Sequence, residues 1–71
     1  MRTEEEILKD FEKLGYEVKK NYDGLCLFHI GGSKIDIIKS GRKYDASMGT
    51  GYMHMQEHKL LNELFTIWGW I

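Results

Sequence analysis

Three residues near the C-terminus have the types and the spacing that zinc chemistry uses. His54, Glu57 and His58 form the pattern His-x-x-Glu-His, which can place two imidazole ligands and a carboxylate base on one helix face. A catalytic zinc needs a third protein ligand, and few residues follow His58 to supply a distant acidic one. If His54 lies before the helix, the spacing of the two imidazoles fails as well. We therefore predict that the spacing arises by chance, with no catalytic residue.

The same histidines have two further candidate ligands in the chain. Cys26 and His29 would complete a four-ligand structural zinc site with His54 and His58, but this spacing matches no known zinc pattern. The five-residue pattern resembles the inverted zinc-peptidase family, and the resemblance extends no further. Cys26 has no obvious activating neighbour and lies in register with Phe28 and Ile30, so we expect a buried thiol. No metal and no cofactor are predicted.

Asp36 and Asp45 are a second candidate pair. A two-residue hairpin turn places them directly opposite each other, where like charges destabilise the strand pair. Three lysines are near enough to relieve this repulsion, namely Lys34, Lys39 and Lys43. A solvated, screened pair is the simplest interpretation, and a cation site or a basic partner surface stays open. Two aspartates without a nucleophile or a pocket do not make an enzyme, and none is predicted. Gly49-Thr50-Gly51-Tyr52 matches neither phosphate-loop pattern.

The elements that would position these residues include two amphipathic helices. In the C-terminal stretch 55–68, apolar side chains recur at helical spacing. This helix should end at Gly69, with Trp70 as the hydrophobic contact of the cap. His54 is the expected N-cap, with Glu57 in a capping-box role. The apolar stripe consists of Leu60, Leu61, Leu64, Phe65, Ile67 and Trp68.

The N-terminal helix is predicted from the same signals. Thr3 and Glu6 form a capping box, and the acidic first turn suits the positive end of the helix dipole. The helix should end at Gly15, with Tyr16 as the cap contact, so a glycine followed by an aromatic residue ends both helices. Its narrow apolar stripe consists of Ile7, Leu8, Phe11 and Leu14.

Three or four antiparallel strands are predicted between the helices, from the candidate segments Tyr16–Lys20, Leu25–Ile30, Lys34–Lys39 and Arg42–Ser47. In the last hairpin, Ile37 lies opposite Tyr44 and Ile35 opposite Ala46, which gives the hairpin one apolar face. The next segment, Met48–His54, is predicted as a loop, with a short strand at its end left open. The chain is therefore expected to be α+β, with the order α-β-β-β-(β)-α in a single domain over residues 1–71. Both helical stripes need cover, so both helices should pack on one face of the small antiparallel sheet.

Composition excludes several classes of protein. The net charge of −1 gives no bulk attraction to nucleic acid, and the single cysteine excludes an internal disulfide framework and fits a reducing cytoplasm. No apolar run is long enough to span a membrane, and the acidic N-terminus is wrong for a signal peptide. Basic side chains outnumber acidic ones over residues 16–47, which predicts a mildly basic sheet between two acidic helices.

The second predicted strand is apolar on both faces, and this suggests a partner surface. Leu25, Leu27 and His29 point one way along it, and we assign Ile38 of the next strand to the same face. If the helices cover the opposite face, Leu25, Leu27 and Ile38 form an apolar patch, as in many protein interfaces. Its predicted polar rim consists of Lys19, His29, Asp36 and Lys43. The predicted partner-binding residues are Leu25, Leu27, His29, Asp36, Ile38, Lys39, Arg42 and Lys43.

Two alternatives to this surface stay open. A bent sheet or the Met48–His54 loop would cover the patch and make Leu25 and Leu27 core residues. The binding surface would then move to the hairpin tip at Ser40–Lys43 or to that loop. A self-complementary patch would serve a second copy of the chain as well as a different protein.

The tail EHKLLNELFTIWGWI, behind a short sheet, resembles the endings of small uncharacterised proteins from phages and prophages of Gram-positive bacteria. This class includes inhibitors of host defence enzymes, anti-CRISPR proteins among them, so the resemblance implies a non-enzymatic protein-binding module acting in the host cytoplasm. The helix–sheet–helix order also resembles the double-stranded-RNA-binding domain, but of that family's basic cluster at the start of the last helix only Lys59 is present. The alternative function is nucleic-acid binding by the basic strands, through Lys19, Lys20, Lys39, Arg42 and Lys43 with Tyr22 and Tyr44.

Overall fold

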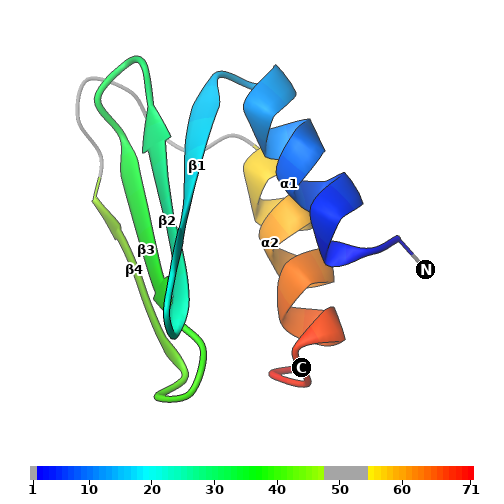
Figure 1. Cartoon of the computed structure of the whole chain (residues 1–71). Helices are drawn as coiled ribbons and strands as arrows, with labels where there is room; N and C mark the ends of the chain where they lie inside the picture. The colour runs from blue at the N-terminus through cyan, green and yellow to red at the C-terminus, as the bar shows by residue number, and fades with distance from the viewer. Residues whose placement is uncertain (1, 48–54) are drawn as a thin grey trace.

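The computed structural model describes residues 2–47 and 55–71 and has two layers, a four-stranded sheet and a pair of helices on one of its faces (Figure 1). The elements are α1 (Glu4–Lys13), β1 (Tyr16–Asn21), β2 (Gly24–His29), β3 (Lys34–Ile38), β4 (Lys43–Ser47) and α2 (Met55–Ile67). This α-β-β-β-β-α order confirms the predicted α+β class, and both helices pack on one face as expected. The predicted loop and short strand within 48–54 lie outside the described residues.

Helix α1 begins with the predicted capping box. The Glu6 N–H donates to Thr3 Oγ1 at 3.3 Å, and the Thr3 N–H donates to Glu6 Oε1 at 3.1 Å. The hydrogen bond from the Thr3 backbone holds the pKa of the Glu6 carboxyl below its ordinary value, because it favours the charged form. These contacts satisfy two backbone donors that the helix itself leaves without partners, so the start of α1 is specified locally.

Both helices end as predicted, at a glycine followed by an aromatic residue. At the end of α2, Gly69 takes a φ of 78°, its N–H donates to the Thr66 carbonyl at 3.1 Å, and the Trp70 N–H donates to the Phe65 carbonyl at 2.8 Å. These two bonds form a Schellman motif, and the rings of Trp70 and Phe65 stack at 4.7 Å between centroids. The predicted N-cap of this helix, His54, lies outside the described residues.

The end of α1 uses related geometry. Gly15 has a φ of 100°, and its N–H donates to the Glu12 carbonyl at 3.0 Å. The ring of Tyr16 then meets the edge of the Phe11 ring at 5.4 Å between centroids. The glycine permits a left-handed turn that returns the chain along the sheet, so the aromatic residue after it becomes part of the core.

The sheet is an antiparallel meander in the order β1-β2-β3-β4. The β3–β4 pair has the predicted register, with Ile37 opposite Tyr44 and Ile35 opposite Ala46. Because β2 pairs Leu25 with Ile37 and Leu27 with Ile35, these leucines share the face of the two isoleucines. That face lies under both helices, and the largest fully buried side chains of the core are Phe11, Ile7, Leu27, Ile35, Ile37 and Leu64.

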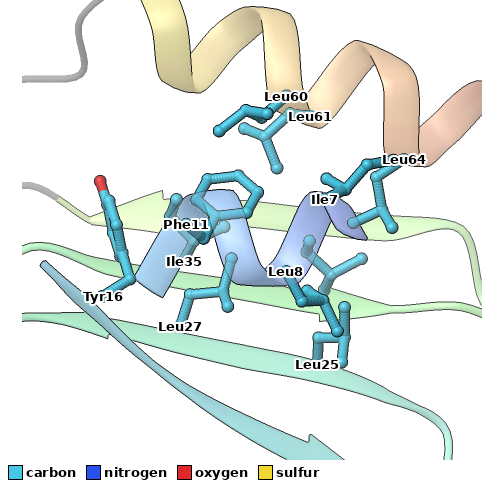
Figure 2. Packing of buried hydrophobic residues seen from close by; sticks show 11 residues of the cluster. Ile7, Leu8, Phe11, Tyr16, Leu25, Leu27, Ile35, Leu60, Leu61 and Leu64 are labelled. Carbon is cyan, nitrogen blue, oxygen red and sulfur yellow. The ribbon is translucent and has the colours of Figure 1, made fainter. Parts of the chain in front are cut away.

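The predicted exposure of Leu25 and Leu27 is therefore wrong. The two side chains are 3% and 0% exposed, and in Figure 2 they lie on the side of the sheet toward α1, with the leucines of α2 above. Ile38 lies on the opposite face at 44% exposure, as predicted for that residue alone. The error is one of strand parity, because Ile38 follows Ile37 and successive side chains alternate between faces. The helices thus cover the Leu25 face and leave the Ile38 face to solvent.

We expect Thr3→Ala to lower the free energy of unfolding by about 1 kcal/mol, because it removes the side chain that caps α1. Urea denaturation followed by circular dichroism would measure the loss. Thr66→Ala is the matched control, since this exposed hydroxyl only donates back to the Asn62 carbonyl at 2.7 Å, and it should change stability by less than about 0.5 kcal/mol. Equal losses from the two variants would contradict a specific capping role.

Candidate partner-binding surface

The outer face, defined as the sheet face turned away from both helices, carries a short apolar centre among charges. Phe28 of β2 is 39% exposed and Ile38 of β3 is 44% exposed. Cys26 lies between their positions and is buried, which confirms the predicted burial of this thiol. Burial, and secondarily the neighbouring Asp36, raises the pKa of the thiol. The charged outer-face residues alternate in sign along each strand, with Glu17 and Lys19 on β1, Lys34 and Asp36 on β3, and Lys43 and Asp45 on β4.

Asp36 and Asp45 lie directly opposite each other on the outer face, as predicted. Lys34 relieves their repulsion, since its Nζ lies 3.6 Å from Asp36 Oδ2 and 5.6 Å from the centroid of the Phe28 ring. Within the described residues, no group of three or more histidine, cysteine or acidic side chains is arranged to hold a metal ion. The pair is therefore part of a mixed-charge surface.

His29 does not belong to the rim of that surface, contrary to the sequence prediction. Its Nε2–H donates to the Leu14 carbonyl at 3.0 Å, while its Nδ1 accepts from the Gly31 N–H at 2.9 Å. The ring also meets Tyr16 at 4.8 Å between centroids. One donor and one acceptor nitrogen correspond to the neutral imidazole, which ties the end of α1 to the β2–β3 turn. His29 therefore has a structural role.

Two residues of the predicted histidine motif, Glu57 and His58, lie in α2 and face different ways. Glu57 is 6% exposed and turns toward the core. Burial of the Tyr16 hydroxyl, and secondarily the negative charge of Glu57, raises the pKa of Tyr16 to about 12. His58 is exposed, and His54 lies outside the described residues. A carboxylate that faces the core and an imidazole that faces solvent do not converge on one ion.

The other predicted site residues gather at one end of the sheet. The segment Ile38–Lys43, which we call the basic tip, joins β3 to β4 and carries Lys39, Arg42 and Lys43 with no acidic residue among them. All of its residues are exposed, and Arg42 turns the chain with a φ of 49°. Four of the eight predicted partner-binding residues thus lie in one continuous segment.

Contacts with neighbouring elements hold the basic tip in place. The Lys39 N–H donates to the Asp23 carbonyl at 2.7 Å, and Ser40 Oγ donates to the Asp23 carboxylate. The Lys39 ammonium lies 5.4 Å from the centroid of the Trp68 ring. These contacts join the tip to the β1–β2 turn and to the end of α2, so Arg42 and Lys43 project from a fixed support.

The aromatic residues proposed for nucleic-acid stacking differ in exposure. Tyr22, in the turn beside the basic tip, is fully exposed. Tyr44 lies on the helix-covered face, with its ring edge-on to Phe65 at 5.4 Å between centroids. Among the cations, Lys20 lies 3.7 Å from the Glu5 carboxylate. Tyr22 beside the tip is therefore the fully exposed ring of the two, whereas Tyr44 is 39% exposed. Arg42 and Lys43 are the exposed cations next to them.

Sequence reasoning missed Phe28 as an exposed outer-face residue. Alternation in the sequence separates Phe28 from Leu27, but only the pairing of Leu27 with Ile35 shows which of the two faces meets the helices. No protein-family model matches the chain, and comparisons with curated proteins and with solved structures return no match. No helix in the described part of the chain is long and apolar enough to cross a membrane.

Proposed function

We propose that this chain is a small non-enzymatic protein-binding module that contacts its partner through the basic tip and the adjoining outer face. One observation carries the proposal: Ile38 is 44% exposed at the base of a supported turn that bears three cations. An exposed apolar side chain within a charged rim is a common arrangement at protein interfaces. The support from Asp23 and Trp68 lowers the entropic cost of binding, because the tip is already ordered.

The chemistry of the tip specifies the kind of partner. Lys39, Arg42 and Lys43 favour an acidic protein surface, since complementary charges raise the association rate and exclude basic competitors. Ile38 requires an apolar contact at the centre of that surface. The resemblance of the C-terminal tail to phage and prophage proteins supports the narrower proposal of an inhibitor of a host defence enzyme, such as an anti-CRISPR protein.

We expect Ile38→Ala to weaken partner binding by about 2 kcal/mol or more, which is the effect of truncating a central contact. Proteins retained from a bacterial lysate by the immobilised wild-type chain would be purified and titrated against each variant by calorimetry. Ile30→Ala is the matched control, because Ile30 is 91% exposed and follows β2 at the opposite end from the tip. It should bind the partner as the wild type does.

The charge contribution is measured separately. Arg42→Glu combined with Lys43→Glu should slow association with the same partner and remove most of its salt dependence. A partner that binds Ile38→Ala and the double variant with wild-type affinity would contradict this site. Equal losses from Ile30→Ala and Ile38→Ala would place the contact elsewhere on the chain.

The second candidate function is nucleic-acid binding by the same basic residues. The fully exposed Tyr22 beside the tip favours it, because an open aromatic ring can stack on a base. In that case duplex or single-stranded probes should bind at about 50 mM salt, with affinity falling steeply as salt rises. Arg42→Glu with Lys43→Glu should abolish this binding, whereas Ile38→Ala should not. Failure to bind any probe at low salt would exclude this function.

A further inference from the structure

Among residues 2–47 and 55–71, strand β1 is an edge of the sheet, and no described strand pairs with its outer side. Helix α1 contacts β1 from the helix-covered face of the sheet (Figure 1). Two shallow hollows meet at Val18 on this edge. Leu8 and Lys9 line one of them, Gly15 and Ile30 line the other, and Val18 lines both. The edge is therefore accessible on both sides of Val18.

The hydrogen bonds at the ends of the strands show which β1 residues face the open edge. The His29 N–H donates to the Ser33 carbonyl, so residues of β2 with odd numbers turn their backbone toward β3. The Ile30 N–H donates to the Gly15 carbonyl, so those with even numbers turn toward β1. By the pairing register, Glu17 and Lys19 then face β2. The backbone donors and acceptors of Tyr16, Val18 and Lys20 consequently point outward.

This alternation limits how two such edges can pair. In an antiparallel pair centred on Val18, Val18 of one copy lies opposite Val18 of the second copy. Glu17 of each copy then lies opposite Lys19 of the other copy. Glu17 and Lys19 occupy non-hydrogen-bonded positions there, where opposite side chains approach closely. The two neighbouring registers place Glu17 opposite Glu17 or Lys19 opposite Lys19, which is unfavourable. One register therefore combines open backbone groups with opposite charges.

We propose that two copies of this chain associate through their β1 edges, antiparallel and about a two-fold axis at Val18. The two-fold axis is perpendicular to the sheet, so the two four-stranded sheets join into one sheet of eight strands with the helices of both copies on the same face. The first hollow brings Glu5 and Glu12 together with Lys9 and Lys20, so the two copies meet there without an excess of like charge. The dimer goes beyond the proposed function, because the two outer faces then lie side by side and the two basic tips lie at opposite ends of the joined sheet.

Charge reversal at the β1 edge tests the pairing. In sedimentation velocity from micromolar to millimolar concentration, the wild type should form a dimer, and Glu17→Lys and Lys19→Glu should each weaken it by at least about tenfold. Equimolar mixing of these two variants should restore a dimer, because every pair across the axis is then opposite in charge. The double variant Glu17→Lys with Lys19→Glu should dimerise as the wild type does.

The controls separate this dimer from the other surfaces. Lys43→Glu makes the same charge change on the outer face of β4 and should leave dimerisation unchanged, as should Ile38→Ala. Glu17 and Lys19 are exposed, so circular dichroism should show that every variant is folded. A wild type that stays monomeric at millimolar concentration would overturn the proposal and make the β1 charges a protection against edge pairing. Variants that fail to form a dimer on mixing would also overturn it.

Discussion

Leu27→Lys should unfold the protein. The side chain is 0% exposed and lies among Leu8, Phe11 and Ile35, so its replacement would place an ammonium group in the apolar centre of the molecule (Figure 2). Burying an unpaired charge there costs more than about 4 kcal/mol, which is comparable with the whole stability expected of a 71-residue domain. Circular dichroism should show loss of helix and no cooperative thermal transition.

Phe28→Lys is the matched control from the same strand. Phe28 is 39% exposed on the outer face, opposite Glu17 on one side and Lys34 on the other, so a new ammonium there keeps its hydration and has one partner of each charge. We expect a loss of less than about 1 kcal/mol and an unchanged circular dichroism spectrum. A folded Leu27→Lys beside an unfolded Phe28→Lys would show that the two faces of β2 are reversed.

The features predicted correctly from the sequence are those that depend on nearby residues. The Thr3–Glu6 capping box and the glycines at 15 and 69 act over one helical turn, so the residue types alone specify them. The register of the β3–β4 hairpin is likewise local, because one short turn determines which residues lie opposite each other. Packing of both helices on one face follows from the narrow stripe that each of them must bury.

The face of β2 that meets the helices depends instead on how β2 pairs with β3. Leu25 and Leu27 on one face and Cys26 and Phe28 on the other are both apolar, so alternation alone does not distinguish them. The choice is made by the turn between β2 and β3, where the bond between His29 and Ser33 sets Leu27 opposite Ile35. A shift of one residue in that pairing would exchange every side chain between the faces.

The candidate site divides in the same way. Lys39, Arg42 and Lys43 belong to the turn between two predicted strands, where exposure follows from position, so their exposure was predictable. His29 was assigned to a polar rim by its type, whereas its ring nitrogens bind the backbone of Leu14 and Gly31. Nothing in the local sequence of His29 indicates a partner fifteen residues away.

Trp68→Ala should lower the free energy of unfolding by about 3 kcal/mol, near the lower end of the range for truncating a large core aromatic residue. The side chain is half-buried, and its ring joins three parts of the chain. Its Nε1–H donates to Glu4 Oε1 at the start of α1 at 2.8 Å, the ring lies edge-on to Trp70 at 5.8 Å, and the Lys39 ammonium lies 5.4 Å from the ring centroid.

Trp68→Phe separates the packing of the ring from its hydrogen bond. Phenylalanine keeps an aromatic surface against the core and under Lys39 but leaves the Glu4 carboxylate without the indole donor. Because that carboxylate remains accessible to water, this variant should lose about 1 kcal/mol, and Glu4→Gln should lose less. Urea denaturation of the three variants would measure these differences. A loss from Trp68→Ala no larger than that from Trp68→Phe would mean that the hydrogen bond, and not the ring, fixes the end of α2 against the rest of the fold.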